Sequence, residues 1–208
     1  MFGLTRDELR NLRTLSSPKK IQDYLDAIPY NFEPDGDTYL SPRRVMREKR
    51  AHCIEGAMLA ALALRLQGER PLLLDLTSAE HDFDHVIALY KRYGCWGAVS
   101  KTNHAVLRYR DPVYRTLREL ALSYFHEYTD DNGHKTLRSY SRPMDLARFD
   151  HIGWATSEED LWDIALALDD VPHYQLVTRA QIAALRNADA TERRAGEIVQ
   201  WKKATASQ

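Results

Sequence analysis

The chain has 208 residues, with 29 lysines and arginines against 30 aspartates and glutamates and only two cysteines. The near-zero net charge excludes a general nucleic-acid binder, which needs excess positive charge to displace counterions from phosphate. Two cysteines form one disulfide at most, which excludes a disulfide scaffold and a four-cysteine zinc site. We expect one domain over 1–208, with a core at about 38–128, N-terminal helices in 1–37 and a C-terminal extension in 129–203.

The sequence lacks the patterns of secretion and of membrane spanning. Acidic residues and an arginine follow the start before any apolar stretch that could serve as a signal. The longest apolar run, residues 57–64, is far shorter than the roughly 18–20 residues that cross a bilayer. Sparse cysteines are typical of reducing compartments. We therefore expect a cytoplasmic protein with no membrane partner and no general nucleic-acid partner.

Capping chemistry predicts three short helices in the first fifty residues. Thr5 and Glu8 form a capping box, and Ser17 and Ser41 each place an N-cap hydroxyl before a proline at the first helical position. The second and third helices are expected at about 18–28 and 42–48. Proline, glycine and acidic residues within 31–38 predict a surface loop between them.

The middle of the chain predicts the core. Residues 53–67 are rich in alanine and leucine, nearly uncharged and followed by Gly68, which predicts a helix buried on nearly every side. Three strand-like runs follow, at 71–77, 85–91 and 95–100. Together they predict an α+β fold in which a central buried helix packs on an antiparallel sheet, with additional N- and C-terminal helices.

The rest of the chain is expected to be mainly helical. Apolar spacing predicts a helix over Val113–Tyr128, and a strand is expected within Leu137–Leu146. Ser157 and Asp160 form the pattern of a capping box at a helix start. Two further amphipathic helices are expected at about 178–188 and 191–202. The tail from 204 to 208 is expected to be disordered.

Cys53 is the first candidate for chemistry because it lies in the first turn of the buried helix. Amide groups and the dipole at a helix N-terminus favour negative charge, so they lower the pKa of a thiol there. The same amides can donate hydrogen bonds to a developing oxyanion. The alternative is that Cys53 is a small core residue, as free cysteines often are. Glu55 adds a favourable charge at the positive end of the helix.

His85, which opens the second strand-like run, is the candidate base for that thiol. Alone, a histidine in this position is more often structural. If residues 91–94 form a four-residue hairpin loop, Tyr90 pairs with Cys95 and His85 lies opposite Ser100. A serine there can accept a hydrogen bond from the imidazole and so fix its orientation.

These segments resemble the transglutaminase-like superfamily of cysteine enzymes, in a bacterial-type branch with papain-like architecture. The resemblance covers roughly residues 40–112 and depends on three stretches in order. They are Ser41 to Ala57 with Cys-Ile-Glu-Gly-Ala, Asp84-His-Val-Ile-Ala-Leu-Tyr, and Trp96-Gly-Ala-Val-Ser. The family implies acyl chemistry through a thioester, with Cys53 as nucleophile and His85 as base.

The third catalytic position departs from the family, which has aspartate where this chain has Ser100. A serine hydroxyl orients the imidazole but cannot stabilise imidazolium as a carboxylate does. Asn103 is a second candidate, because papain-like enzymes use asparagine, and Asp111 is a more distant one. Asp82 and Asp84 adjoin the histidine, but the side chain of Asp84 points to the opposite face of the strand. We rank Ser100 and Asn103 above the acids.

Two cation-rich runs flank these candidates. They are Arg43, Arg44, Arg47, Lys49 and Arg50, and then Arg108, Arg110, Arg115 and Arg118. Such runs are usually solvated faces with salt bridges. The functional alternative is an electropositive cleft mouth that lowers the thiol pKa and attracts an acidic substrate.

A further alternative is a divalent-metal site, because imidazoles and carboxylates suit Zn²⁺. Its ligands would come from residues 81–85 with His52, Cys53 and His104.

The sequence thus predicts a cysteine hydrolase or acyltransferase that acts on an amide or peptide bond. Cys53 attacks, His85 takes and returns the proton, and Ser100 or Asn103 holds the ring. The expected partner is a peptide, a protein or another amide substrate, and no cofactor or metal is expected. The second hypothesis is a catalytically degenerate relative that binds a peptide or protein in the same cleft. This second hypothesis is motivated by the absence of the family's aspartate, where this chain has Ser100.

Overall fold

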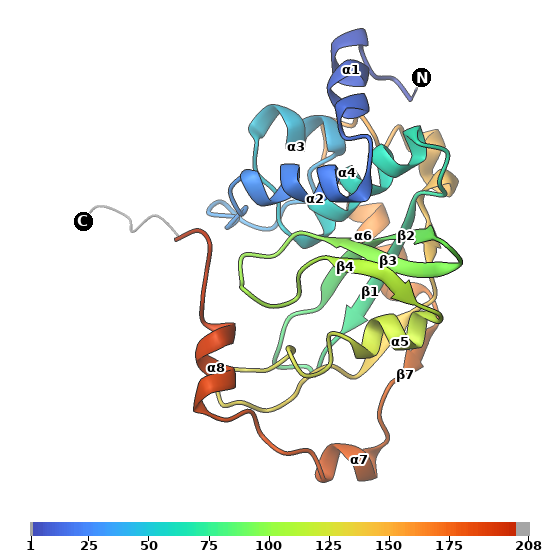
Figure 1. Ribbon diagram of the computed structural model, residues 1–208. Coiled ribbons are helices and arrows are strands. Elements are labelled where there is room, and N and C mark those ends of the chain that lie inside the picture. Colours follow the sequence, from blue (N-terminus) through green and yellow to red (C-terminus); the bar gives the residue numbers. More distant parts are fainter. Residues whose placement is uncertain (1, 203–208) are drawn as a thin grey trace, which may run out of the picture.

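The computed structural model describes residues 2–202 and combines helices with one antiparallel sheet (Figure 1). The helices are α1 (Arg6–Thr14), α2 (Pro18–Ala27), α3 (Pro42–Glu48), α4 (Cys53–Leu66), α5 (Leu117–Leu122), α6 (Trp162–Asp170), α7 (Arg179–Ala183) and α8 (Ala190–Gly196). The strands are β1 (Leu72–Thr77), β2 (His85–Arg92), β3 (Cys95–Ser100), β4 (Arg110–Tyr114), β5 (Ser139–Ser141), β6 (Met144–Asp145) and β7 (His173–Gln175). A 3₁₀ helix spans Leu146–Ile152. The α+β prediction is confirmed at this level.

The three N-terminal helices begin where the capping residues predict. Thr5 and Glu8 exchange hydrogen bonds in a complete capping box, and the hydroxyls of Ser17 and Ser41 accept from the backbone three residues on. Each hydroxyl satisfies an amide that the helix itself leaves without a partner. Helices α1, α2 and α3 then pack around α4 on one side of the sheet (Figure 1).

Helix α4 is the buried centre of this layer, as its composition predicts. Its residues from Ile54 to Leu64 are all buried, and they pack on β2, with smaller contacts to β1 and β3. The sheet is apolar on both faces because alternate residues of a strand point to opposite sides. In β1, Leu73 joins the α4 layer, whereas Leu72 and Leu74 join a second apolar layer that contains α5.

Gly56 allows α4 to lie against the segment that follows β3. A Cβ atom at this position would lie 2.5 Å from Cβ of Lys101, which is fully buried. The Lys101 side chain cannot swing away freely, because Nζ donates to the carbonyls of Leu25 (2.7 Å) and Ile28 (2.6 Å) at the end of α2. Burial lowers the pKa of Lys101 to about 8.

Replacing Gly56 with alanine should therefore lower the free energy of unfolding by about 2–3 kcal/mol through overpacking. Helix propensity alone would make the alanine variant more stable by about 1 kcal/mol. The sign of the stability change therefore separates overpacking from helix propensity. Urea unfolding measures the change. Gly196→Ala is the matched control, since a Cβ there meets no atom within 4 Å. Equal stability of the two variants would contradict the packing at Gly56.

The sheet has the order β4-β3-β2-β1-β5-β7, and β6 also pairs with β1. Strands β1, β2 and β3 lie where the sequence predicts. The expected strand within 137–146 is split into β5 and β6. The C-terminal extension therefore adds β5, β6 and β7 to the sheet as well as packing helices around it, and sequence reasoning did not foresee β7.

The helix expected over Val113–Tyr128 is helical only in its middle part, Leu117–Leu122. Residues up to Tyr114 form β4, which pairs with β3. A new capping box, Thr116 with Glu119, starts the short helix α5, which ends at Leu122 before a series of turns. The apolar spacing was genuine, but the capping box marks the helix start more accurately than the spacing does.

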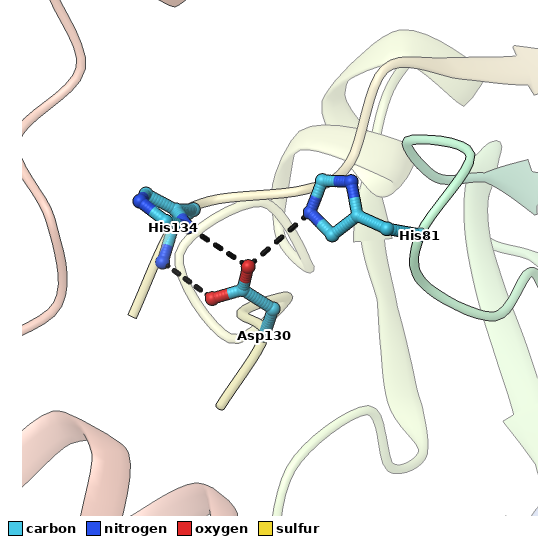
Figure 2. Close-up of side chains that lie close together, drawn as sticks. All are labelled: His81, Asp130 and His134. Carbon is cyan, nitrogen blue, oxygen red and sulfur yellow. Dashed lines mark hydrogen bonds and ion pairs between the residues drawn. The ribbon is translucent and has the colours of Figure 1, made fainter. Parts of the chain in front are cut away.

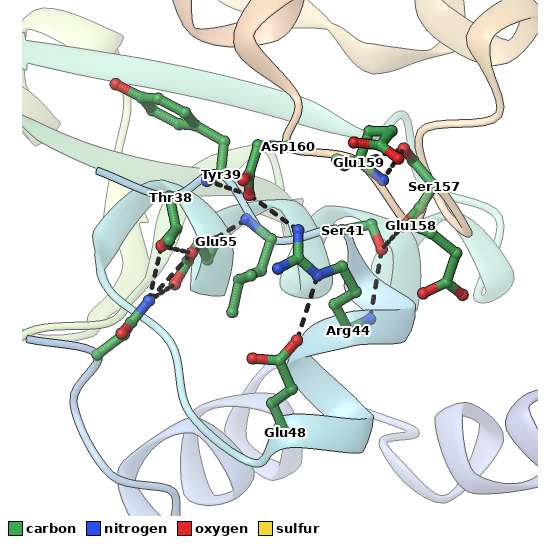
Figure 3. Close-up of polar contacts among 12 residues, drawn as sticks. Thr38, Tyr39, Ser41, Arg44, Glu48, Glu55, Ser157, Glu158, Glu159 and Asp160 are labelled. Atoms are coloured by element: carbon green, nitrogen blue, oxygen red, sulfur yellow. Dashed lines mark hydrogen bonds and ion pairs between the residues drawn. The ribbon is translucent and has the colours of Figure 1, made fainter. Parts of the chain in front are cut away.

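The capping box expected at Ser157 and Asp160 is also wrong. The Ser157 hydroxyl accepts from the backbone two residues later, which makes a turn. Asp160 instead accepts from the Tyr39 amide (2.9 Å) and from the Arg44 guanidinium (2.9 Å), so it connects this turn to α3 and to the segment before it (Figure 3). Helix α6 begins only at Trp162.

The C-terminal helices are shorter than expected. Helix α7 has five residues and α8 seven, and after α8 the chain runs extended beside residues 103–105. The tail from 204 to 208 lies outside the described residues. Among residues 2–202, no helix combines the length and the apolar character that crossing a bilayer requires.

Candidate functional site

The start of α4 opens into a cavity of about 510 Å³. Its walls are Tyr30, Cys53 and His85, with the loops 81–84, 101–107 and 127–131, and the end of α8 closes one side. Cys53 is partly exposed and His85 is buried. The structure thus brings together, in one cavity, the two side chains that the sequence selects for nucleophile and base.

Cys53 is the first residue of α4, directly after the N-cap His52. Burial by itself would raise the pKa of the Cys53 thiol. Hydrogen bonds and positive charge from His52 and His85 outweigh burial and lower that pKa to about 5. At neutral pH the sulfur is therefore a thiolate, the form of cysteine that acts as a nucleophile.

Ser100 holds the ring of His85. Nε2 of His85 lies 2.7 Å from Oγ of Ser100, and that hydroxyl donates to the carbonyl of Leu107 at 2.5 Å. Because the serine proton is used by Leu107, Oγ accepts from the imidazole N–H. Nε2 therefore carries a proton, and Nδ1 is the nitrogen that remains available to Cys53.

The hairpin that presents Ser100 differs from the expected one. Tyr93 and Gly94 form a two-residue turn with φ of +53° and +80°, so Arg92 pairs with Cys95 and Ile87 lies opposite Ser100. The expected four-residue loop was wrong because it ignored that Tyr-Gly can adopt this turn. The register is shifted by two residues, which leaves every side chain on its original face. The Ser100 hydroxyl therefore still reaches the His85 ring, from a diagonal position.

Asn103 does not hold His85. Its side chain donates to the carbonyl of Trp201 (3.0 Å) and accepts from the Trp201 amide (2.8 Å). The backbone continues this pairing, since Gln200 donates to Asn103 and Ala105 donates to Ile198, both at 2.8 Å. Asn103 thus fixes the C-terminal segment beside the cavity, and the proposal that it orients the imidazole has no support in these contacts.

The acids near the histidine have other partners among the described contacts. Asp82 accepts from the Thr136 hydroxyl, and Asp84 accepts from the Ser78 amide at 2.7 Å. Asp111 is exposed on β4. None of the three has a described hydrogen bond to His85, which agrees with the lower rank that the sequence gave them.

His52 is the residue of this site that sequence reasoning missed as a partner of the thiol. Its Nε2 donates to the carbonyl of Thr38 (2.8 Å), and its Nδ1 lies 3.9 Å from Sγ of Cys53. Burial lowers the pKa of His52, but Cys53 and Glu55 outweigh it and raise that pKa to about 10. The available signal was position, because an N-cap side chain folds back over the first helical turn.

Glu55 is a buried anchor, and its role exceeds the helix-dipole effect expected of it. It is 0% exposed and accepts from four donors. They are the Asn31 side-chain amide, the Thr38 hydroxyl (2.8 Å) and the backbone amides of Leu40 (3.0 Å) and His52 (2.8 Å). Figure 3 shows the contact between Thr38 and Glu55. Both ends of the loop expected at the surface are therefore fastened to α4, and only its tip, 34–37, is exposed.

The basic run before Cys53 is a salt-bridged face. The pairs are Arg43 with Glu8, Arg44 with Glu48 and Asp160, Arg47 with Glu158, and Arg50 with Glu48. The cavity itself is lined by six carboxylates, those of Asp82, Asp84, Glu127, Asp130, Asp131 and Glu197, against the cations Lys101 and Arg193. The alternative of an electropositive mouth is therefore wrong, and the lining favours cations.

The histidines that the sequence suggested as metal ligands each have a different partner. His52 and His85 have the partners given above, and Nδ1 of His104 lies 2.7 Å from the Gly196 carbonyl. His81 instead lies beside Asp130 and His134, a cluster that the sequence did not suggest (Figure 2).

Comparison with models of known protein families found no match, and comparison with curated proteins found none either. Family membership is therefore not shown. The transglutaminase-like resemblance rests on the order of three stretches of sequence, those that contain Cys53, His85 and Trp96, and stays a prediction.

Proposed function

We propose that the chain is a cysteine hydrolase or acyltransferase of transglutaminase-like type, which acts on an amide or peptide bond through a thioester. The observation that carries the proposal is the Cys53 thiol, with its lowered pKa, between two imidazoles at a helix N-terminus. Perturbed thiols of this kind are typical of nucleophilic cysteines.

Acylation uses each of these groups. The Cys53 proton already lies on Nδ1 of His85, so the Cys53 thiolate attacks the substrate carbonyl carbon, and the C–S bond forms as the carbonyl π electrons move onto oxygen. The backbone amide of Cys53, which has no partner within its own helix, donates to the oxyanion. The C–N bond then breaks, and the leaving amine receives the proton from His85.

Deacylation reverses the roles. A water molecule gives a proton to His85 while the water oxygen attacks the thioester carbon. The C–S bond then breaks and the carboxylic acid leaves. Cys53 regains a proton or remains paired with the imidazolium of His85. An amine in place of water would give acyl transfer. We favour hydrolysis, since no feature of the cavity selects an amine acceptor.

His52 has a separate part in this scheme. Its Nε2 lies 3.4 Å from carboxylate oxygens of both Glu33 and Glu55, so its positive charge is balanced within the protein. It acts as a fixed charge that stabilises the thiolate, while His85 moves the proton. The carboxylates that line the cavity favour a substrate with cationic groups, in contrast to the acidic substrate that the basic run suggested.

The second candidate is a catalytically degenerate protein that binds a peptide in this cleft. Two observations favour it: serine replaces the family's acid, and the chain's own residues 198–200 already pair as an extended strand with 103–105 beside the cavity. That pairing is the geometry by which sheet edges capture peptides.

Acylation by p-nitrophenyl acetate separates the two candidates. We expect a burst of nitrophenolate, one acetyl group on Cys53 by peptide mass mapping, and slow release of acetate. Cys53→Ala should abolish the burst, and His85→Ala should slow it by about 10²–10⁴-fold. Acetylation of Cys53 that is no faster than that of glutathione and is unchanged by His85→Ala would favour the binding protein.

Ser100 and Asn103 provide a matched pair of variants. Ser100→Ala removes the hydrogen bond to His85 Nε2, and the misplaced ring should slow acylation on the order of 10- to 100-fold. Asn103→Ala should leave acylation within about twofold, while limited proteolysis near Trp201 becomes faster because the C-terminal segment is released. Equal acylation rates in the two variants would contradict the role given to Ser100.

A further inference from the structure

We propose that His81, Asp130 and His134 form a binding site for a divalent transition-metal ion, with Zn²⁺ as the best fit. The three side chains come from two loops, and their candidate ligand atoms all lie within 4.8 Å of one another. Figure 2 shows both imidazoles directed at the same carboxylate. The cluster is distinct from the Cys53 residues and does not rest on the function proposed for them.

The distances suit tetrahedral coordination. Zn²⁺ binds histidine nitrogen and carboxylate oxygen at about 2.0–2.1 Å, which places neighbouring tetrahedral ligands about 3.3 Å apart. Oδ2 of Asp130 lies 3.2 Å from Nε2 of His81 and 2.9 Å from Nδ1 of His134. The two histidine side chains are 59% and 54% exposed, so their rings can turn slightly to admit an ion between the three atoms.

The carboxylate is held in position by the chain itself. Asp130 is only 11% exposed, and its Oδ1 accepts from the amides of Asn132 (2.9 Å) and His134 (2.8 Å). Oδ2 is thereby left for the imidazoles. Partners of this kind around a ligand orient it for a metal and raise the affinity.

The two loops are also fixed relative to each other without an ion. The Thr136 hydroxyl donates to Asp82, next to His81, and the Tyr128 hydroxyl donates to the carbonyl of Phe83. The loop of Asp130 is closed by its own backbone, since Asp130 donates to the His134 carbonyl at 3.0 Å. These contacts do not use the candidate ligand atoms, so the ligands are brought together as in a preformed site.

The ligand set selects the class of ion. Two imidazoles and one carboxylate suit Zn²⁺ and neighbouring transition metals, whereas Mg²⁺ and Ca²⁺ prefer oxygen ligands. Three protein ligands leave a fourth position for water or another small ligand. Because His81 and Asp130 also line the cavity that contains Cys53, a molecule in that cavity could reach the ion.

Titration of the full chain with Zn²⁺ by calorimetry, and with Co²⁺ by visible absorption, tests the site. We expect one ion per chain with tetrahedral Co²⁺ bands. Affinity should fall at least tenfold in His81→Ala and in His134→Ala, and stay unchanged in His151→Ala, an exposed histidine in the 3₁₀ helix. Thermal melting of each apo variant shows that it is folded.

Cys53→Ser separates this proposal from the thiol chemistry. Unchanged binding in that variant supports the site at His81, Asp130 and His134, whatever the outcome of the acylation experiment. Loss of binding in Cys53→Ser would move the ion to the thiol and overturn the proposal. Absence of binding in the unmodified chain, or binding that neither histidine substitution weakens, would also overturn it.

Discussion

Replacing Glu55 with glutamine should lower the free energy of unfolding by about 2–4 kcal/mol, the largest stability effect of any single change considered. Glutamine has the same shape, but its NH₂ group would replace one of the two carboxylate oxygens, either the one that accepts from Thr38 and Leu40 or the one that accepts from the His52 amide. Buried donors that lose an acceptor cost about 1–3 kcal/mol each, more where charge is involved. Urea unfolding at pH 7 measures the loss.

Glu159→Gln is the matched control for this substitution. Glu159 is exposed in the turn before α6 and should change stability by less than about 0.5 kcal/mol. If the two variants unfold at the same urea concentration, Glu55 does not anchor the loop of residues 31–40. A loss confined to Glu55→Gln would support the network drawn in Figure 3.

Replacing His52 with glutamine should raise the pKa of Cys53 by about one to two units, the range that one nearby opposite charge produces. Burial raises the pKa of the Cys53 thiol, and in this variant His85 is the one imidazole that still lowers it. For a pKa that moves from about 5 to about 7, the thiolate fraction at pH 6 falls from about nine-tenths to about one-tenth. The pH dependence of alkylation by iodoacetamide measures the shift.

His104→Gln is the control for that experiment, since His104 lines the same cavity but its ring contacts the Gly196 carbonyl. The alkylation midpoint of this variant should stay where it is in the parent chain. An unchanged midpoint in His52→Gln would mean that the helix N-terminus and His85 suffice to stabilise the thiolate, and that the contact between His52 and Cys53 has no electrostatic importance.

Much of the fold could be predicted from local chemistry. The caps at Thr5, Ser17 and Ser41 locate helix starts because each satisfies an amide within a few residues of itself. The same pattern at Ser157 failed because Asp160 bonds to Tyr39 and Arg44, more than a hundred residues away in sequence. Tertiary partners of this kind leave no local signal.

In the site, too, local patterns could be predicted and tertiary contacts could not. Helix position selected Cys53 and strand pattern selected His85, and both line one cavity. Ser100 was reached through a wrong register that happened to preserve the face of the strand. The buried role of Glu55 and the cluster of His81, Asp130 and His134 depend on loops that meet only in the folded chain, so spacing could not predict them.

The central claim is that Cys53 is a thiolate at neutral pH. Its direct test is the alkylation rate of Cys53 from about pH 4 to pH 10, with Cys95 replaced by serine so that one thiol remains. Protonation removes the nucleophile, so the rate should fall only as the pH drops through about 5 and stay flat above it. A rate that rises through about pH 8.5, as for an ordinary thiol, would contradict the account.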